Sequence, residues 1–99
     1  MRVITGTARG RRLETLSGDD VRPTSEMVKE AVFSMIQFDI EGRKFLDLFA
    51  GSGQMGIEAL SRGAGLAVFV DAAEPSVQMV KKNLADTGLA DRARVLRSD

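Results

Sequence analysis

The second half of the sequence alternates short apolar runs with helix-forming segments, and this alternation restricts the fold more than any other feature. The strand-like runs at 44–50, 66–70 and 94–98 are each long enough for a strand, and two of the three strands are nearly continuously apolar. The segments between them, 54–62 and 75–86, have apolar residues at helical spacing. Strands joined through helices run parallel, so the sequence predicts an α/β fold: a Rossmann-like parallel sheet, buried on both faces.

The residues before this sheet follow a different pattern. Two β-type segments, 2–5 and 12–16, are separated by a glycine-containing basic stretch and predict an N-terminal β-hairpin within residues 1–20. Apolar residues at helical spacing then predict an N-terminal helix within residues 21–42. With 43–99 as the first half of a cofactor-binding sheet, the whole chain is expected to form a single partial domain.

The composition excludes several kinds of catalytic site. The chain has no cysteine and no histidine, which excludes thiol nucleophiles, Ser-His-Asp triads and nearly all zinc sites. We therefore predict no metal site. No apolar run approaches the ~20 residues that a membrane span needs, and the start has no signal-peptide pattern, so a cytoplasmic protein without membrane contact is expected.

The predicted sheet has an incomplete edge. In a complete doubly wound sheet the first strand lies centrally, yet one of its edges has no predicted partner in this chain. An unpaired edge exposes backbone N–H and C=O groups and favours pairing with another chain. We therefore expect a truncated fragment that self-associates through this edge.

A glycine-rich turn follows the first predicted strand. Gly51 and Gly53 allow the chain to bend sharply and a ligand to approach the backbone closely. With Gly56 they also match the dinucleotide fingerprint, and Asp71, twenty residues after Gly51, ends the next strand, where a carboxylate can bind ribose hydroxyls. A fragment that binds an NAD-type dinucleotide is therefore one interpretation.

Asp47 favours a different cofactor. It interrupts an apolar strand that is expected to be buried, where an unpaired carboxylate is unfavourable or takes up a proton. The methionyl ammonium of S-adenosylmethionine would neutralise it, whereas a dinucleotide brings a pyrophosphate. Two structural alternatives remain open: Asp47 could pair with an internal Arg or Lys, and Asp71 could be a helix N-cap.

Several motifs together resemble the RsmD family of 16S ribosomal RNA guanine-N2 methyltransferases, which are class I S-adenosylmethionine-dependent enzymes. The glycine turn with its acid would indicate only an enzyme of that class, and the hairpin with Arg22-Pro23-Thr24 makes the narrower assignment. The motifs span nearly the whole chain: Arg2-Val3-Ile4-Thr5-Gly6, Gly10-Arg11-Arg12-Leu13, Arg22-Pro23-Thr24, Val28-Lys29-Glu30-Ala31-Val32-Phe33, Asp47-Leu48-Phe49-Ala50-Gly51-Ser52-Gly53 and Glu58-Ala59-Leu60-Ser61-Arg62-Gly63-Ala64.

The resemblance implies S-adenosylmethionine as the cofactor and ribosomal RNA, or the small ribosomal subunit, as the partner. It places Asp47 at the methionyl end, Asp71 at the ribose and Asp99 at the adenine amino group. The implied cofactor-binding residues are Asp47, Phe49, Ala50, Gly51, Ser52, Gly53, Asp71, Asp99, Thr24 and Arg22. The residues implied to hold RNA phosphates are Arg9, Arg11 and Arg12.

The chain also departs from the family. Ala72-Ala73 stands where many relatives have charged residues, and the Asn/Asp-Pro-Pro-aromatic motif that holds the target amine and a flipped-out base is absent. We therefore predict no catalytic residue in this chain and no methyl transfer by it alone. In the family reaction the guanine amine attacks the sulfonium methyl, which requires positioning and no metal. A non-catalytic alternative is a small RNA-binding module that uses the basic hairpin, whose tip could also be only a solvated loop.

Overall fold

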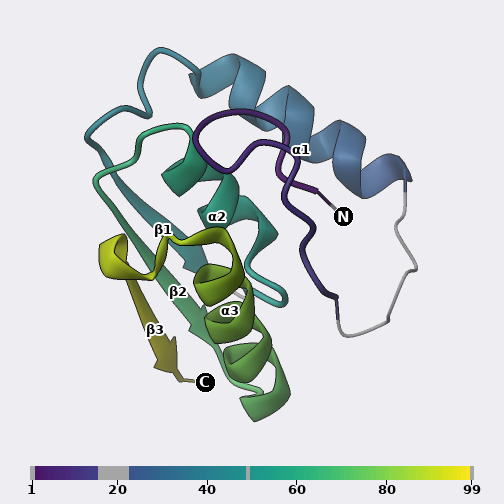
Figure 1. Cartoon of the computed structure of the whole chain (residues 1–99), viewed down its shortest axis with the longest axis vertical. Coiled ribbons are helices and arrows are strands. Elements are labelled where there is room, and N and C mark those ends of the chain that lie inside the picture. Colours follow the sequence, from purple (N-terminus) through teal and green to yellow (C-terminus); the bar gives the residue numbers. More distant parts are fainter. Residues whose placement is uncertain (1, 16–22, 49, 99) are drawn as a thin grey trace.

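The computed structural model describes residues 2–15, 23–48 and 50–98, and in it the chain folds around one parallel sheet (Figure 1). In chain order the elements are α1 (Pro23–Ile36), β1 (Lys44–Leu48), α2 (Gln54–Ser61), β2 (Leu66–Asp71), α3 (Glu74–Thr87), the short 3-10 helix η1 (Ala90–Arg92) and β3 (Ala93–Arg97). From β1 onward the bounds lie within two residues of the predicted ones, whereas α1 ends at Ile36, before the predicted end near residues 39–42.

The strands lie in the order β1-β2-β3 and run parallel. β1 and β2 are in register from Lys44 opposite Leu66 to Leu48 opposite Val70. α2 and α3 supply the crossover connections that parallel pairing requires. The predicted fold class, a Rossmann-like parallel α/β sheet, is therefore confirmed.

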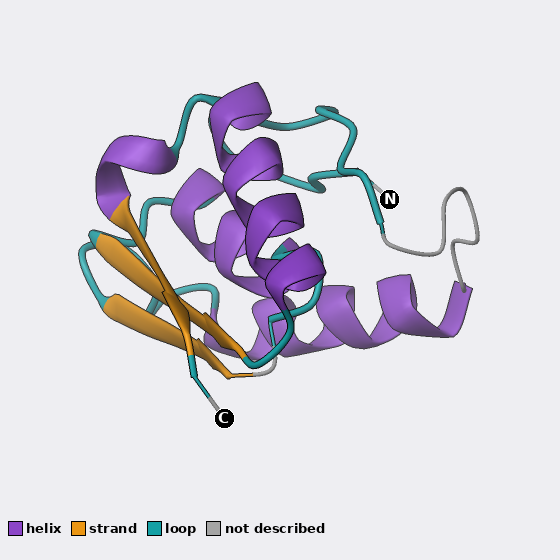
Figure 2. Ribbon diagram, turned by 90° about the horizontal axis from the view of Figure 1, so that it is seen from below, coloured by secondary structure: helices purple, strands orange, loops and turns teal. Residues whose placement is uncertain are grey.

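In the part of the chain that the structure describes, helices cover one face of the sheet and leave the other exposed. Phe69 of β2 is fully buried beside α2, and the ring of Phe45 on β1 stacks on that of Phe33 on α1 with the centroids 6.0 Å apart. Figure 2 shows the helices gathered on this side of the sheet. Side chains alternate between faces along a strand, and those of Leu46 and Leu48 on β1, 61% and 56% exposed, lie on the opposite face.

The prediction that the strands are buried on both faces is therefore wrong for the described residues. Successive right-handed crossovers in a sheet that grows in one direction place α2 and α3 on the same face. Covering the second face requires strands added on the other side of β1, with helices of their own. Among the described strands β1 pairs with β2 alone, so its outer edge is unpaired, as expected.

Helix α2 packs against the sheet at its third residue, Gly56, where there is no room for a side chain. A Cβ atom on Gly56 would lie 2.3 Å from the nearest atom of the Phe69 ring. At its other end α2 is capped by Arg92, whose guanidinium donates hydrogen bonds to the carbonyls of Ala64 (2.6 Å) and Leu60 (3.1 Å). Orphan carbonyls at a helix C-terminus need such donors, so Arg92 of η1 helps to fix α2 against the sheet.

Residues 2–15, here called the N-terminal arm, reverse direction as predicted, but a single antiparallel bridge between Arg2 and Arg12 takes the place of a regular hairpin. The Val3 N–H donates to the Arg11 carbonyl (3.0 Å) and the Gly10 N–H to the Val3 carbonyl (2.9 Å). The next amide groups along the arm donate to side chains of α2 instead of to a partner strand. The ladder therefore stops after one bridge.

None of the helices in the described ranges has the length and apolar character needed to cross a membrane.

We expect Gly56→Ala to lower the free energy of unfolding by about 1–3 kcal/mol, the usual effect of overpacking, because the added methyl group would overlap the Phe69 ring. Urea denaturation followed by circular dichroism measures this loss. In a Phe69→Leu background the added methyl should be less unfavourable, so the two substitutions are expected to be non-additive. Additive losses would show that the ring does not set the distance between α2 and the sheet.

Candidate cofactor site

The turn between β1 and α2 presents backbone to the carboxyl edge of the sheet. Gly51 (φ 59°) and Gly53 (φ 82°) adopt left-handed conformations, and Gly53 is the N-cap of α2. A Cβ on Gly53 would lie 3.2 Å from Val80 of α3, whereas one on Gly51 would meet nothing within 4 Å. The backbone is thus packed against the protein at Gly53 and open at Gly51. We call residues 50–53 the glycine loop.

Asp47, near the end of β1, contacts the first turn of α2, which follows this loop. Its side chain is 8% exposed, and Oδ2 accepts a hydrogen bond from the Gly56 N–H at 3.0 Å. No Arg or Lys of the described ranges forms an ion pair with it, so the alternative of an internal cationic partner finds no support there. Burial raises the pKa of Asp47 to about 6; the Gly56 hydrogen bond opposes this shift, and the charge of Asp71 adds to it.

Asp71, the last residue of β2, ties the glycine loop to the neighbouring strand. Oδ2 accepts a hydrogen bond from the Gly51 N–H (3.0 Å) and Oδ1 one from the Ala73 N–H (2.9 Å). The bonds from Ala73 and then from Gly51 hold the pKa of Asp71 below its ordinary value. The N-cap of α3 is Ala73, so the alternative in which Asp71 caps that helix is not what the structure contains.

Together these side chains make one edge of the sheet negatively charged. Asp47 and Asp71 lie on adjacent parallel strands at their carboxyl ends, which is where ligands bind in open α/β sheets. Their like charges repel, and one of them is buried without a cation among the described residues. The positive charge of a cationic ligand would relieve this repulsion. If the ligand also carried hydroxyl groups, these could replace the Gly51 N–H as hydrogen-bond donors to Asp71.

The remaining residues predicted for the cofactor site are placed unevenly. Ala50 is buried and Ser52 half-buried in the glycine loop. Thr24 lies in the first turn of α1, where only the backbone is described. Phe49, Asp99 and Arg22 lie outside the described residues.

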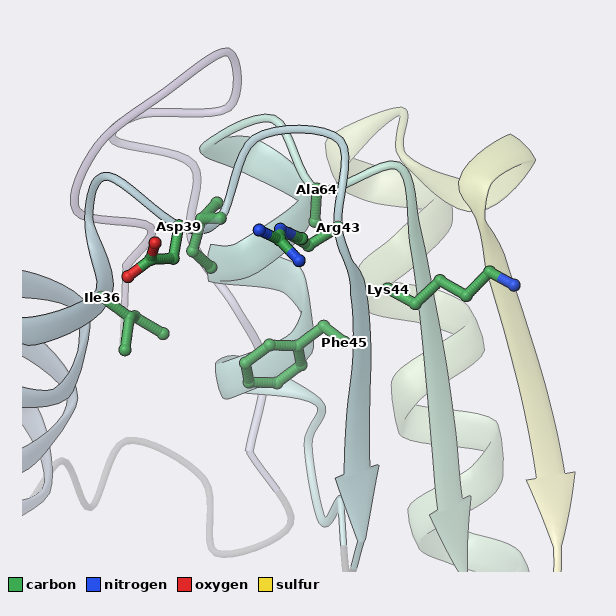
Figure 3. Close-up of a pocket in the computed structure, with 7 residues that line it drawn as sticks. Ile36, Asp39, Arg43, Lys44, Phe45 and Ala64 are labelled. Atoms are coloured by element: carbon green, nitrogen blue, oxygen red, sulfur yellow. The ribbon is translucent and has the colours of Figure 1, made fainter.

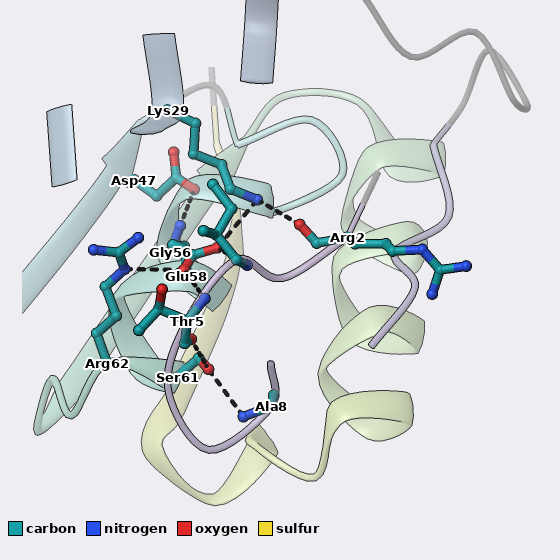
Figure 4. Close-up of polar contacts among 10 residues, drawn as sticks. Arg2, Thr5, Ala8, Lys29, Asp47, Gly56, Glu58, Ser61 and Arg62 are labelled. Carbon is teal, nitrogen blue, oxygen red and sulfur yellow. Dashed lines mark hydrogen bonds and ion pairs between the residues drawn. The ribbon is translucent and has the colours of Figure 1, made fainter. Parts of the chain in front are cut away.

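The predicted RNA-binding residues Arg9, Arg11 and Arg12 are exposed on the N-terminal arm, which is anchored to α2 by the buried carboxylate of Glu58 (Figure 4). Glu58 accepts the N–H groups of Ile4 (2.8 Å) and Thr5 (3.0 Å).

The charge of Glu58 is compensated inside the protein. It pairs with Lys29 of α1 (3.2 Å) and with Arg62 (2.9 Å). Burial alone would raise the pKa of Glu58, but the hydrogen bond from Ile4, together with Arg62, Lys29 and Thr5, holds it below its ordinary value. Unlike Asp47, Glu58 is therefore a structural carboxylate with its own cations.

The sequence prediction missed Asn83 of α3, which is completely buried and donates a hydrogen bond to the Ser52 carbonyl of the glycine loop at 2.9 Å. The available signal was its position, because Asn83 lies on the inward face that α3 shares with Val77, Val80 and Leu84. A carboxamide on an apolar helix face needs hydrogen-bond partners from elsewhere in the chain.

A cavity of about 370 Å³ lies at the other end of the sheet (Figure 3). It is lined by Ile36, Asp39, Ile40, Arg43, Lys44, Phe45 and Ala64. Lys44 begins β1, so this cavity is at the amino end of the strands, away from the glycine loop. Across the part of the chain that the structure describes, no cluster of three or more acidic side chains could hold a metal ion.

Comparison with known proteins gives consistent matches over the chain. The family model described as "Conserved hypothetical protein 95" matches residues 1–99. The putative rRNA methyltransferase YlbH of Bacillus subtilis is 48% identical over 100% of this chain and 54% of that protein. Ribosomal RNA small subunit methyltransferase D of Escherichia coli is 40% identical over 100% of this chain and 50% of that protein.

The solved structures agree with these matches. A structure described as the putative methyltransferase yhhF from Escherichia coli has a TM-score of 0.87 and 40% identity, over 100% of this chain and 54% of that one. The chain thus spans about half the length of the relatives it matches.

We expect Asp47→Asn to stabilise the protein in a pH-dependent way. The pKa of Asp47 is raised from 3.8 to about 6, so folding favours its protonated form. The contribution of Asp47 to the free energy of unfolding is therefore fully present below pH 3.8 and is lost as the pH rises to about 6. The variant should therefore exceed the wild type in free energy of unfolding by about 2–3 kcal/mol at pH 8, and the difference should shrink below about pH 4. Urea titrations over this pH range measure it.

Glu58→Gln is the matched control. Because the pKa of Glu58 is lowered, the pH dependence of its contribution to stability has the opposite sign. That variant should lose the most stability at neutral pH and less in acid. A pH-independent difference for Asp47→Asn would show that the carboxylate is not buried in its charged form.

Proposed function

We propose a function for this chain on the basis of its family, since the chain belongs to the RsmD family. It forms the S-adenosylmethionine half-site of a methyltransferase that acts on the N2 amine of a guanine in small-subunit ribosomal RNA. The observation that carries the proposal is the buried carboxylate of Asp47, which has no ion-pair partner among the described residues and is bonded to the first turn of α2, directly after an open glycine loop. A ligand with an ammonium group supplies the missing cation.

The residues of the site fit the groups of this cofactor. Asp47 would hold the methionyl ammonium, and Asp71 would exchange its bond from the Gly51 N–H for the ribose hydroxyls. The open backbone at Gly51 allows close approach of the ligand. Roles for Asp99 at the adenine and for Arg22 and Thr24 near the carboxylate rest on the family resemblance alone. A dinucleotide would place its pyrophosphate beside two carboxylates, which is electrostatically unfavourable.

The cofactor, when bound, supplies an electrophilic methyl group, and this chain's own residues hold and orient it. The chain contains no Asn/Asp-Pro-Pro-aromatic segment, so we propose that it does not position the target amine and does not transfer a methyl group by itself. The exposed Arg9, Arg11 and Arg12 of the arm would bind RNA phosphates. A ribosomal RNA substrate in turn implies action in the cytoplasm on the small ribosomal subunit.

Self-association is the second part of this proposal. The outer edge of β1 has no partner among the described strands, and Leu46 and Leu48 are exposed beside it. An edge of this kind is a template for pairing with a second chain.

Calorimetry with S-adenosylhomocysteine, which keeps the ammonium and the ribose, tests the cofactor assignment. We expect Asp47→Asn to weaken binding at least about tenfold, since the variant removes a charge-assisted hydrogen bond to a buried group. Asp39→Asn is the matched control, because it makes the same chemical change at the opposite end of the sheet and should leave the affinity unchanged. Equal affinities for wild type and Asp47→Asn, or tighter binding of NAD, would overturn the assignment.

RNA binding is tested through its salt dependence. We expect the double variant Arg9→Gln, Arg11→Gln to bind ribosomal RNA fragments more weakly. The slope of log affinity against log salt should fall by about 0.7–0.9 for each phosphate that the variant no longer neutralises. Arg94→Gln, an exposed arginine on β3, serves as the control. RNA affinity that persists with a full salt slope in the double variant would exclude the arm as the binding surface.

A further inference from the structure

We infer that Asn83 is a positioning residue that links the N-terminal arm to the glycine loop, so that ordering one of them stabilises the other. Asn83 belongs to α3, which lies beside both segments, and its side chain is 0% exposed. The arm and the loop are far apart in sequence, and the arm runs beside α2, the helix that follows the loop (Figure 1).

The carboxamide of Asn83 makes three hydrogen bonds. Oδ1 accepts from the Glu14 N–H at 2.9 Å, and Nδ2 donates to the Glu14 carbonyl at 2.9 Å. The second Nδ2 hydrogen is donated to the Ser52 carbonyl, also at 2.9 Å. Asn83 therefore pairs with both backbone groups of Glu14, as a neighbouring strand would, and uses its remaining donor on the loop.

Because both segments bind the same carboxamide, the stability of the N-terminal arm and that of the glycine loop depend on each other. If the arm leaves, the carboxamide loses the two Glu14 backbone groups that fix its orientation and is uncovered to water. It can then rotate, so its hydrogen bond to the Ser52 carbonyl is weakened. The arm also forms hydrogen bonds with Glu58 and Ser61 of α2 and with Lys29 of α1, and the Glu14 side chain pairs with Lys82 of α3 (3.0 Å). None of these contacts reaches the loop.

Coupling of this kind is reciprocal, since any ligand that orders the loop also favours the attached arm. The part of the inference that concerns ligands rests on the proposed function: cofactor bound at Ser52 and Gly51 would order the arm that carries Arg9 and Arg11. The protein would then present its RNA-binding arm in an ordered form when the methyl donor is in place.

Amide exchange measured by NMR on the chain without ligand tests the link directly. Ser61→Ala loosens the arm from a distance, because Ser61 Oγ accepts the Ala8 N–H (2.9 Å) and donates to the Thr5 carbonyl (2.6 Å). We expect it to speed exchange at the Gly53 amide at least threefold. In an Asn83→Leu background the same substitution should leave Gly53 unchanged. An equal effect in both backgrounds, or no effect in the wild type, overturns the inference.

Leu84→Ala is the matched control for lost stability. Leu84 is the neighbouring residue of α3 and equally buried, but its side chain forms no hydrogen bond with the arm or the loop. In this background Ser61→Ala should still speed exchange at Gly53. If Asn83→Leu does not fold, Asn83→Asp replaces it, since the carboxylate still accepts the Glu14 N–H but can donate neither to the Ser52 carbonyl nor to the Glu14 carbonyl.

S-adenosylhomocysteine then separates the inference from the proposed function. In the wild type it should slow exchange at the arm amides of Val3 and Gly10, and in Asn83→Asp this slowing should fall at least threefold. Binding at the loop without any slowing in the arm overturns the coupling. A failure to bind contradicts the proposed function only, and the ligand-free comparison still decides the role of Asn83.

Discussion

The packing of α2 against β2 is the constraint on which the rest of the structure depends. Only a glycine at position 56 leaves room for the Phe69 ring, and the same backbone position donates its N–H to Asp47. Two residues further along the helix, Glu58 holds the N-terminal arm and α1. A single short helix thus determines how the sheet is packed, where the glycine loop lies and where the arm is attached.

The two buried carboxylates of this region behave in opposite ways, and the contrast carries the functional argument. Glu58 has Lys29 and Arg62 beside it, and its pKa is lowered. Among the described residues, Asp47 has one N–H donor and no cation, and its pKa is raised. A fold that supplies two cations to one buried carboxylate leaves another, at the edge where ligands bind, without any in the described ranges. That difference is what an ammonium-bearing cofactor would correct.

Much of the fold and half of the site could be predicted from local patterns. Apolar periodicity gave the strands and helices of the sheet, and the glycine spacing gave the turn after the first strand. The hydrogen bond from the Gly51 N–H to Asp71 was not predicted. The exposure of one face of the sheet was not predicted. An apolar strand has the same sequence pattern whether the second face of its sheet is buried or exposed. Leu46 and Leu48 are the residues that reveal the difference.

The sequence by itself determined the order of the elements, the glycine turn, the acids at the strand ends and, with the matching motifs, the family. These depend on residues a few positions apart, whose periodicity and turn preferences act before any tertiary contact forms. Only the tertiary structure decided which buried polar groups are satisfied. Glu58 meets Ile4, and Asn83 meets Glu14 and Ser52, across sequence separations of 54, 69 and 31 residues. No local pattern encodes partners that chain folding brings together.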